Sequence, residues 1–326
     1  MDGRRSGDNM DGDIGARAAR LRPGVLGWGH AVVGLLAAMV CVLLPSLVLM
    51  STGGAQMAAG ADGGDLDAMP KLAVPPWMAL AQFVPLLIIV ALVLRGARRK
   101  TVREEGNGAG SSTGSGAARR PGEMAAVESG RFFGPGTLRA LLVIGVIAVI
   151  IAVVANIFLA VRGEAPNSLA GKLGLGKGAG ADLLIIAGAA CIGPVAEELA
   201  FRGLVFRGVF DALGSRARAT RFTMPLITAT VISTVTFAIA HQDPSMGQNV
   251  FFAAVGAFAC IAYWATRSLT SAAWIHSVVN SIALAVAFFW STDHGTVVHG
   301  VALVAAPFVA LAVMAALSRF VGVARL

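Results

Sequence analysis

Eight long apolar stretches are the feature that most limits what this chain can fold into. They cover residues 25–50, 74–94, 138–161, 182–206, 222–241, 248–266, 269–290 and 298–318. A helix needs about 20 mostly apolar residues to cross the hydrocarbon core of a bilayer. Only 13% of the 326 residues are charged, whereas water-soluble domains carry about 25%. The sequence therefore predicts an all-α, polytopic membrane helix bundle of about eight transmembrane helices.

One polar segment divides these stretches into two groups. Residues 95–137 are rich in Gly, Ser, Arg and Glu and contain the run GNGAGSSTGSGAARRPG, a composition typical of a flexible linker. We expect a cytoplasmic tail at 1–24, a two-helix transmembrane hairpin at 25–94, a flexible basic linker at 95–137 and a six-helix transmembrane body at 138–326.

The net charge of +8 is concentrated at the ends of the apolar stretches. Basic residues precede the first stretch and follow the second, whereas loop 51–73 carries three Asp and one Lys. Because basic loops stay on the cytoplasmic side, we expect both termini to be cytoplasmic, with the protein in the plasma membrane. Membrane lipid is the expected partner of this charge. Nucleic acid is not, since no soluble basic domain is visible.

The fourth stretch contains three charged residues, Glu197, Glu198 and Arg202. Each costs about 2.5–3.5 kcal/mol at the centre of a membrane helix. Glu198 and Arg202 are four residues apart and can form an ion pair on one helix face. Glu197 points about 100° away and has no partner in its own helix. A structural ion pair that locks two helices together is the alternative interpretation of Glu198 and Arg202.

Two later stretches carry polar side chains at helical spacing. FAIAH places Phe237 and His241 on one face of the fifth stretch, and HSVVN places His276 and Asn280 on one face of the seventh. An interfacial histidine and an asparagine that bridges helices are the structural alternatives. With Glu197, these side chains are of the types that build a hydrolytic site. A carboxylate and a histidine can activate water, and donors such as Asn and His can hold an oxyanion.

A metal site is a second interpretation of the same residues. Two histidines and a carboxylate with an open position form a known catalytic zinc arrangement, and Glu197, His241 and His276 supply this set. No HExxH sequence is present, so the commonest zinc helix signature is missing. No cofactor is firmly predicted, and a divalent metal such as zinc stays open.

Three motifs resemble those of a known family. EELAFRG (197–203), FAIAH and HSVVN occur in this order and are similar to the EExxxR, FxxxH and HxxxN motifs of the CPBP family of CAAX proteases and bacteriocin-processing enzymes, also called Abi proteins. This family is similar to the eukaryotic type II CAAX prenyl endopeptidases. The resemblance covers roughly residues 138–326, so the six-helix body would be the catalytic domain.

The resemblance implies an intramembrane endopeptidase that acts on peptide or lipid-modified protein substrates. Glu197 would activate water together with His241, and His276 and Asn280 would stabilise the oxyanion. The remaining motif residues, Glu198, Arg202 and Phe237, would support the site. The family mechanism is either glutamic or metal-dependent, and the residues leave both open.

Two other functions remain open from the sequence. One is a non-catalytic membrane scaffold or bacteriocin-immunity protein of the same fold. The other is an ion-coupled transporter, because intramembrane Glu, Arg and His also mark ion pathways. No inverted repeat, which transporters often contain, is visible.

The depth of His241 is a difficulty for a shared site. It lies about 20 residues after Arg221, near the outer face, whereas His276 lies nine residues after Arg267, in the inner half. We expect either a shifted or tilted fifth helix or an interfacial segment at 208–221.

Overall fold

The computed structural model describes residues 26–51, 75–108, 137–161, 173–214, 223–241, 245–266, 268–291 and 295–321. Every regular element within these ranges is a helix. Among the described residues, seven helices are long and apolar enough to span a membrane, and an eighth has a shorter apolar part at Trp28–Leu43. The predicted all-α membrane bundle is therefore confirmed. The tail at 1–24 and residues 109–136 of the predicted linker lie outside the described residues.

The helical elements follow the apolar stretches closely, and the symbol η marks π-helical segments. In chain order they are α2 (Trp28–Ser51), α3 (Met78–Gly108), α5 (Thr137–Val161), α7 (Ala179–Ile186), η2 (Ala187–Ile192), α8 (Gly193–Glu198), η3 (Leu199–Phe206), α9 (Arg207–Gly214), α10 (Thr223–Ala240), α11 (Met246–Thr266), α12 (Leu269–Val286), η4 (Ala287–Ser291) and α13 (Val297–Val321).

Two boundaries differ from the sequence prediction. Helix α3 continues to Gly108, so residues 95–108 of the predicted linker are helical. This part contains Ala, Arg, Lys and Glu, which favour a helix once one has started. The fourth stretch, predicted at 182–206, is a continuous helical span at 179–214. We refer to this span, α7 through α9, as the motif helix.

The motif helix changes its hydrogen-bonding pattern twice. Two π-helical segments, η2 and η3, flank α8, a six-residue α-helical segment that ends at Glu198. Pro194 is at the start of α8, where its missing N–H interrupts the regular α-helical ladder. Short π segments inside α-helices occur frequently at functional sites.

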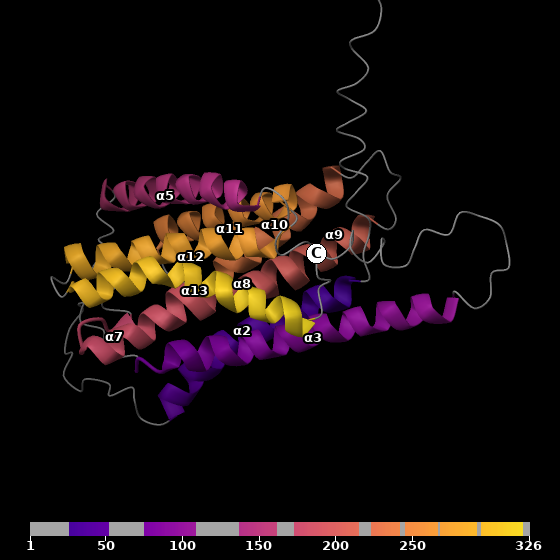
Figure 1. The fold of residues 1–326 in the computed structure, drawn as a ribbon, viewed down its shortest axis with the longest axis horizontal. Coiled ribbons are helices and arrows are strands. Elements are labelled where there is room, and N and C mark those ends of the chain that lie inside the picture. The colour runs from indigo at the N-terminus through magenta and orange to yellow at the C-terminus, as the bar shows by residue number, and fades with distance from the viewer. Residues whose placement is uncertain are drawn as a thin grey trace, which may run out of the picture.

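The motif helix and α12 form the centre of the bundle. In each of these two helices, 56% of the residues in the apolar membrane-spanning stretch are buried, compared with 22% in α3 and in α5. The motif helix contacts α2, α3, α10, α12 and α13. Figure 1 shows α5 on one side of the bundle and the hairpin of α2 and α3 on the opposite side, with the other helices between them.

The N-terminal hairpin packs directly on the motif helix. A Cβ added at Gly188 would lie 2.5 Å from Cβ of Ala79 in α3, and one added at Gly34 of α2 would lie 2.7 Å from Cβ of Leu204. Close contacts through small residues are a common way for membrane helices to associate. The hairpin, which the sequence separates from the six-helix body, is thus part of the same packed bundle.

We expect Gly188→Ala to destabilise the protein by about 1–3 kcal/mol, because the added methyl group overlaps Ala79 in a packed contact. Thermal unfolding in detergent measures this change. Gly180→Ala in α7 is the matched control, because nothing lies within 4 Å of its added Cβ and Ala favours a helix more than Gly does. Equal midpoints for the two variants would show that α3 does not approach the motif helix this closely.

Candidate active site

Glu198 and Arg202 form a buried ion pair inside the bundle. Nη1 of Arg202 donates to Oε1 of Glu198 at 2.9 Å, and both side chains are fully buried. Nη2 donates to the carbonyl of Gly256 in α11 at 2.9 Å, and the guanidinium lies 4.6 Å from the Phe237 ring centroid. The ion pair that the i,i+4 spacing predicts is therefore present, and it also attaches the motif helix to α11.

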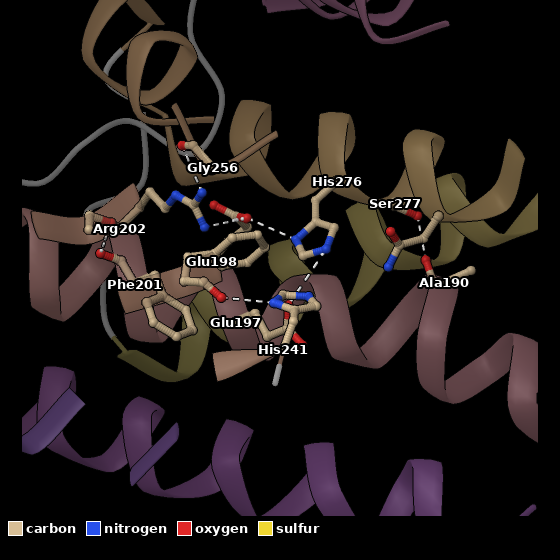
Figure 2. A network of polar contacts seen from close by, with 12 residues as sticks. Ala190, Glu197, Glu198, Phe201, Arg202, His241, Gly256, His276 and Ser277 are labelled. Carbon is tan, nitrogen blue, oxygen red and sulfur yellow. Dashed lines mark hydrogen bonds and ion pairs between the residues drawn. The ribbon is translucent and has the colours of Figure 1, made fainter. Parts of the chain in front are cut away.

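His276 lies between the two glutamates of the motif. Its Nδ1 is 2.9 Å from Oε1 of Glu198, and its Nε2 is 3.6 Å from Oε2 of Glu197. An ionised carboxylate only accepts hydrogen bonds, so Nδ1 carries a hydrogen and donates it to Glu198. This bond fixes the orientation of the ring and turns Nε2 toward Glu197, as Figure 2 shows.

Glu197 differs from its neighbour in accessibility and in bonding. Its side chain is 14% exposed, whereas that of Glu198 is 0% exposed. Within the described part of the chain, Oε2 of Glu197 has no hydrogen-bond partner. Oε2 of Glu198 also has none there, but it is enclosed in the bundle. Glu197 is therefore the more accessible of the two carboxylates.

His241 approaches Glu197 from the end of α10. Its Nδ1 is 2.8 Å from the carbonyl oxygen of Phe237, which can only accept, so Nδ1 donates and Nε2 keeps its lone pair. The ring stacks on Phe252 of α11, with centroids 3.9 Å apart. Figure 2 shows Glu197, His241 and His276 directed toward one another. Both histidines are thus held through Nδ1, and Nε2 is left for chemistry.

The arrangement of the helices explains how His241 and His276 reach the same level. Glu197 lies about 17 residues before the end of α9, and His241 lies about 18 residues after the start of α10. These helices pack against each other, so both residues are about 25 Å from the ends near residues 214 and 223. His276 is only about 10 Å from the start of α12. The α9 end therefore extends about 15 Å beyond that start. The expected interfacial segment at 208–221 lies within the described residues only as far as Gly214 and stays a prediction.

Asn280 makes a different contact from the other motif residues. Its Nδ2 donates to the carbonyl of Ala189 in η2 at 2.8 Å. Ser277, which the sequence interpretation passed over, donates its hydroxyl to the carbonyl of Ala190. The structure therefore brings together Glu197, Glu198, Arg202, Phe237, His241 and His276, and it bonds Asn280 to the motif helix about two turns before Glu197. The available sequence signal for Ser277 was Pro194, whose missing N–H leaves a carbonyl without its usual donor.

The residues present do not form a metal centre as they are placed. Among the residues that the structure describes, no three His, Cys, Asp or Glu side chains are grouped so that they could hold a metal ion. We therefore derive no step through a metal for Glu197, His241 and His276.

Comparison with known proteins identifies one family. Residues 179–282 match the family model described as type II CAAX prenyl endopeptidase Rce1-like, and this segment contains all three motifs, from α7 to most of α12. No curated protein matches the chain, and no solved structure does so. Over this segment, the chain is similar to the Rce1-like family of type II CAAX prenyl endopeptidases.

Proposed function

We propose that this protein is an intramembrane endopeptidase that hydrolyses a peptide bond in membrane-associated or lipid-modified protein substrates. The observation that carries the proposal is the approach of Glu197 to His276 and His241, from three helices, inside an apolar bundle. The family match supports CAAX-protease activity of this general kind. The residue roles and the substrate class are the further steps of the proposal.

In the proposed reaction, Glu197 is the general base. Its carboxylate takes a proton from a water molecule, which His241 also orients through the lone pair on Nε2. The water oxygen attacks the carbonyl carbon of the scissile amide and forms a tetrahedral oxyanion. The C–N bond then breaks, and the departing amine takes the proton back from Glu197. The products are a carboxylic acid and an amine, so atoms and charges balance without another reactant.

The oxyanion is stabilised by donors from α12. His276 donates from Nε2 in the form that carries both ring hydrogens. The amide of Asn280 has a second hydrogen on Nδ2 beside the one that it gives to Ala189. Glu198 and Arg202 act through His276, because the bond from Nδ1 to Glu198 holds the ring in position. Such pre-arranged donors commonly supply a large part of catalysis in water-poor sites.

The level of the site indicates the side from which substrate enters. His276 is about 10 Å from the start of α12, at the end of the bundle where α11 ends beside Arg267. If both termini are cytoplasmic, as the basic loops predict, this is the cytoplasmic half of the plasma membrane. We propose that substrates with a lipid-embedded segment present their cleavage site at this depth.

Glu197→Gln should lower kcat by about 10²–10⁴-fold, because the amide cannot accept a proton from water. The probe is a quenched fluorescent peptide that ends in a farnesylated CAAX sequence, with the full chain in lipid nanodiscs. Glu104→Gln, the same change near the end of α3, is the control and should cleave at the wild-type rate. Wild-type cleavage by Glu197→Gln would remove Glu197 from the mechanism. An unchanged cellular phenotype for Glu197→Gln, His241→Ala and His276→Ala would favour a non-catalytic scaffold.

The two adjacent glutamates should differ in their effect on stability. Glu198→Gln leaves Arg202 buried without its anionic partner and should destabilise the fold by about 3–5 kcal/mol. Glu197→Gln removes no ion pair with Arg202 and should leave the unfolding midpoint close to that of wild type. Thermal unfolding of both variants in the same detergent checks this difference. Similar losses of stability would contradict the separate roles assigned to the two carboxylates.

Metal removal should leave cleavage unchanged, because the proposed base is the Glu197 carboxylate and no step of the proposed reaction uses a metal ion. The measurement compares cleavage of the farnesylated peptide before and after treatment with 1,10-phenanthroline, together with metal analysis of the active protein. Loss of cleavage that stoichiometric Zn²⁺ restores would instead support a zinc site at Glu197, His241 and His276.

A further inference from the structure

We propose that Ser277 is a positioning residue for catalysis. Its hydroxyl bonds to the motif helix about two turns before Glu197, and this bond sets how α12 presents His276 to that glutamate. The inference rests on the proposed endopeptidase function, and it assigns a role to a side chain outside the polar positions of the three motifs.

The motif helix contains two adjacent carbonyls that lack their usual helical donors. Pro194 has no N–H, so the carbonyl of Ala190 loses the donor that an α-helix would supply. The N–H of Gly193 bonds to the carbonyl of Gly188 in the π pattern. The carbonyl of Ala189 therefore loses its α-helical donor, and its π-helical donor would again be Pro194.

Side chains of α12 replace both missing donors. The Ser277 hydroxyl donates to Ala190, and Nδ2 of Asn280 donates to Ala189. Ser277 is completely buried, and a buried carbonyl left without a partner costs about 1–3 kcal/mol. Within the membrane, lipid cannot form hydrogen bonds to these carbonyls in place of the side chains. The irregular segment of the motif helix is thus completed by α12 itself.

These bonds lie between the two helices that carry the catalytic groups. Ser277 directly follows His276 in α12, and Ala190 lies about two turns before Glu197 in the motif helix. Figure 2 shows the bond from Ser277 to Ala190 beside the contact of His276 with the two glutamates. A slide of α12 along the motif helix would change the 3.6 Å separation between Nε2 of His276 and Oε2 of Glu197. Misplacement of catalytic groups by about 1 Å can lower a rate by about 10²-fold.

The experiment compares Ser277→Ala with a variant that restores a backbone donor. Ser277→Ala should lower kcat on the farnesylated peptide by about tenfold or more and leave KM within about twofold, because Ser277 does not touch substrate. The double variant Pro194→Ala/Ser277→Ala regains an N–H at the start of α8 that faces Ala190. It should recover most of the lost kcat.

Ser281→Ala is the matched control on the same helix. Ser281 is buried, and its hydroxyl has no hydrogen-bond partner among the residues for which the structure gives a placement. Its replacement should leave kcat unchanged. If Ser277→Ala does not fold, Ser277→Cys replaces it, because a thiol has a similar shape but is a weak donor, and the same loss and rescue are expected.

Two results would overturn the inference. One is a wild-type kcat for Ser277→Ala, and the other is a loss that Pro194→Ala does not rescue. Glu197→Gln is measured on the same probe to separate this failure from a failure of the proposed function. Wild-type cleavage by Glu197→Gln overturns the function itself. An inactive Glu197→Gln together with a fully active Ser277→Ala overturns only the positioning role.

Discussion

The buried Glu198 carboxylate is the group on which the geometry of the site depends. One of its oxygens accepts hydrogen bonds from both Arg202 and His276, and Arg202 continues to the Gly256 carbonyl. Charges inside an apolar bundle are costly unless they are paired, so these contacts hold three helices in one relative position. The neighbouring Glu197 is then left more accessible, with an oxygen directed toward Nε2 of His276. The two adjacent glutamates thus supply one fully buried, ion-paired carboxylate and one more accessible carboxylate, which is the proposed general base.

The irregular backbone of the motif helix is stabilised by the helices that carry the other motifs. Ser277 and Asn280 of α12 bond to carbonyls in η2, and Ser233 of α10 donates to the carbonyl of Phe201 in η3 at 3.0 Å. Backbone groups that leave the regular helical pattern need protein partners inside a membrane. The π segments and the positions of α10 and α12 therefore depend on each other, which links local backbone geometry to the distances between catalytic groups.

Much of this arrangement follows from sequence, and the remainder depends on how the helices are aligned. Apolar length predicts the helices, and four-residue spacing predicts the Glu198–Arg202 pair. The depth of His241 in the membrane was harder to predict. A count from Arg221 and Arg267 assumes that the loops that carry them lie at the same depth, whereas α9 extends beyond the start of α12. The bonds of Asn280 to Ala189 and of Arg202 to Gly256 join residues about 91 and 54 positions apart. Such contacts depend on the register between helices, which residue spacing within one helix does not encode.

The inter-helix bonds also bear on the choice between hydrolysis and ion transport. Alternating access requires one group of helices to move against another around a central site. In this bundle, such a movement of the motif helix would break the bond from His276 to Glu198 and the bond from Arg202 to Gly256, both of which are buried. Breaking a buried charged pair costs about 3–5 kcal/mol. Hydrolysis needs these bonds to persist while a proton moves between water, Glu197 and the leaving amine. The same contacts that would oppose a transport cycle therefore favour a fixed catalytic site.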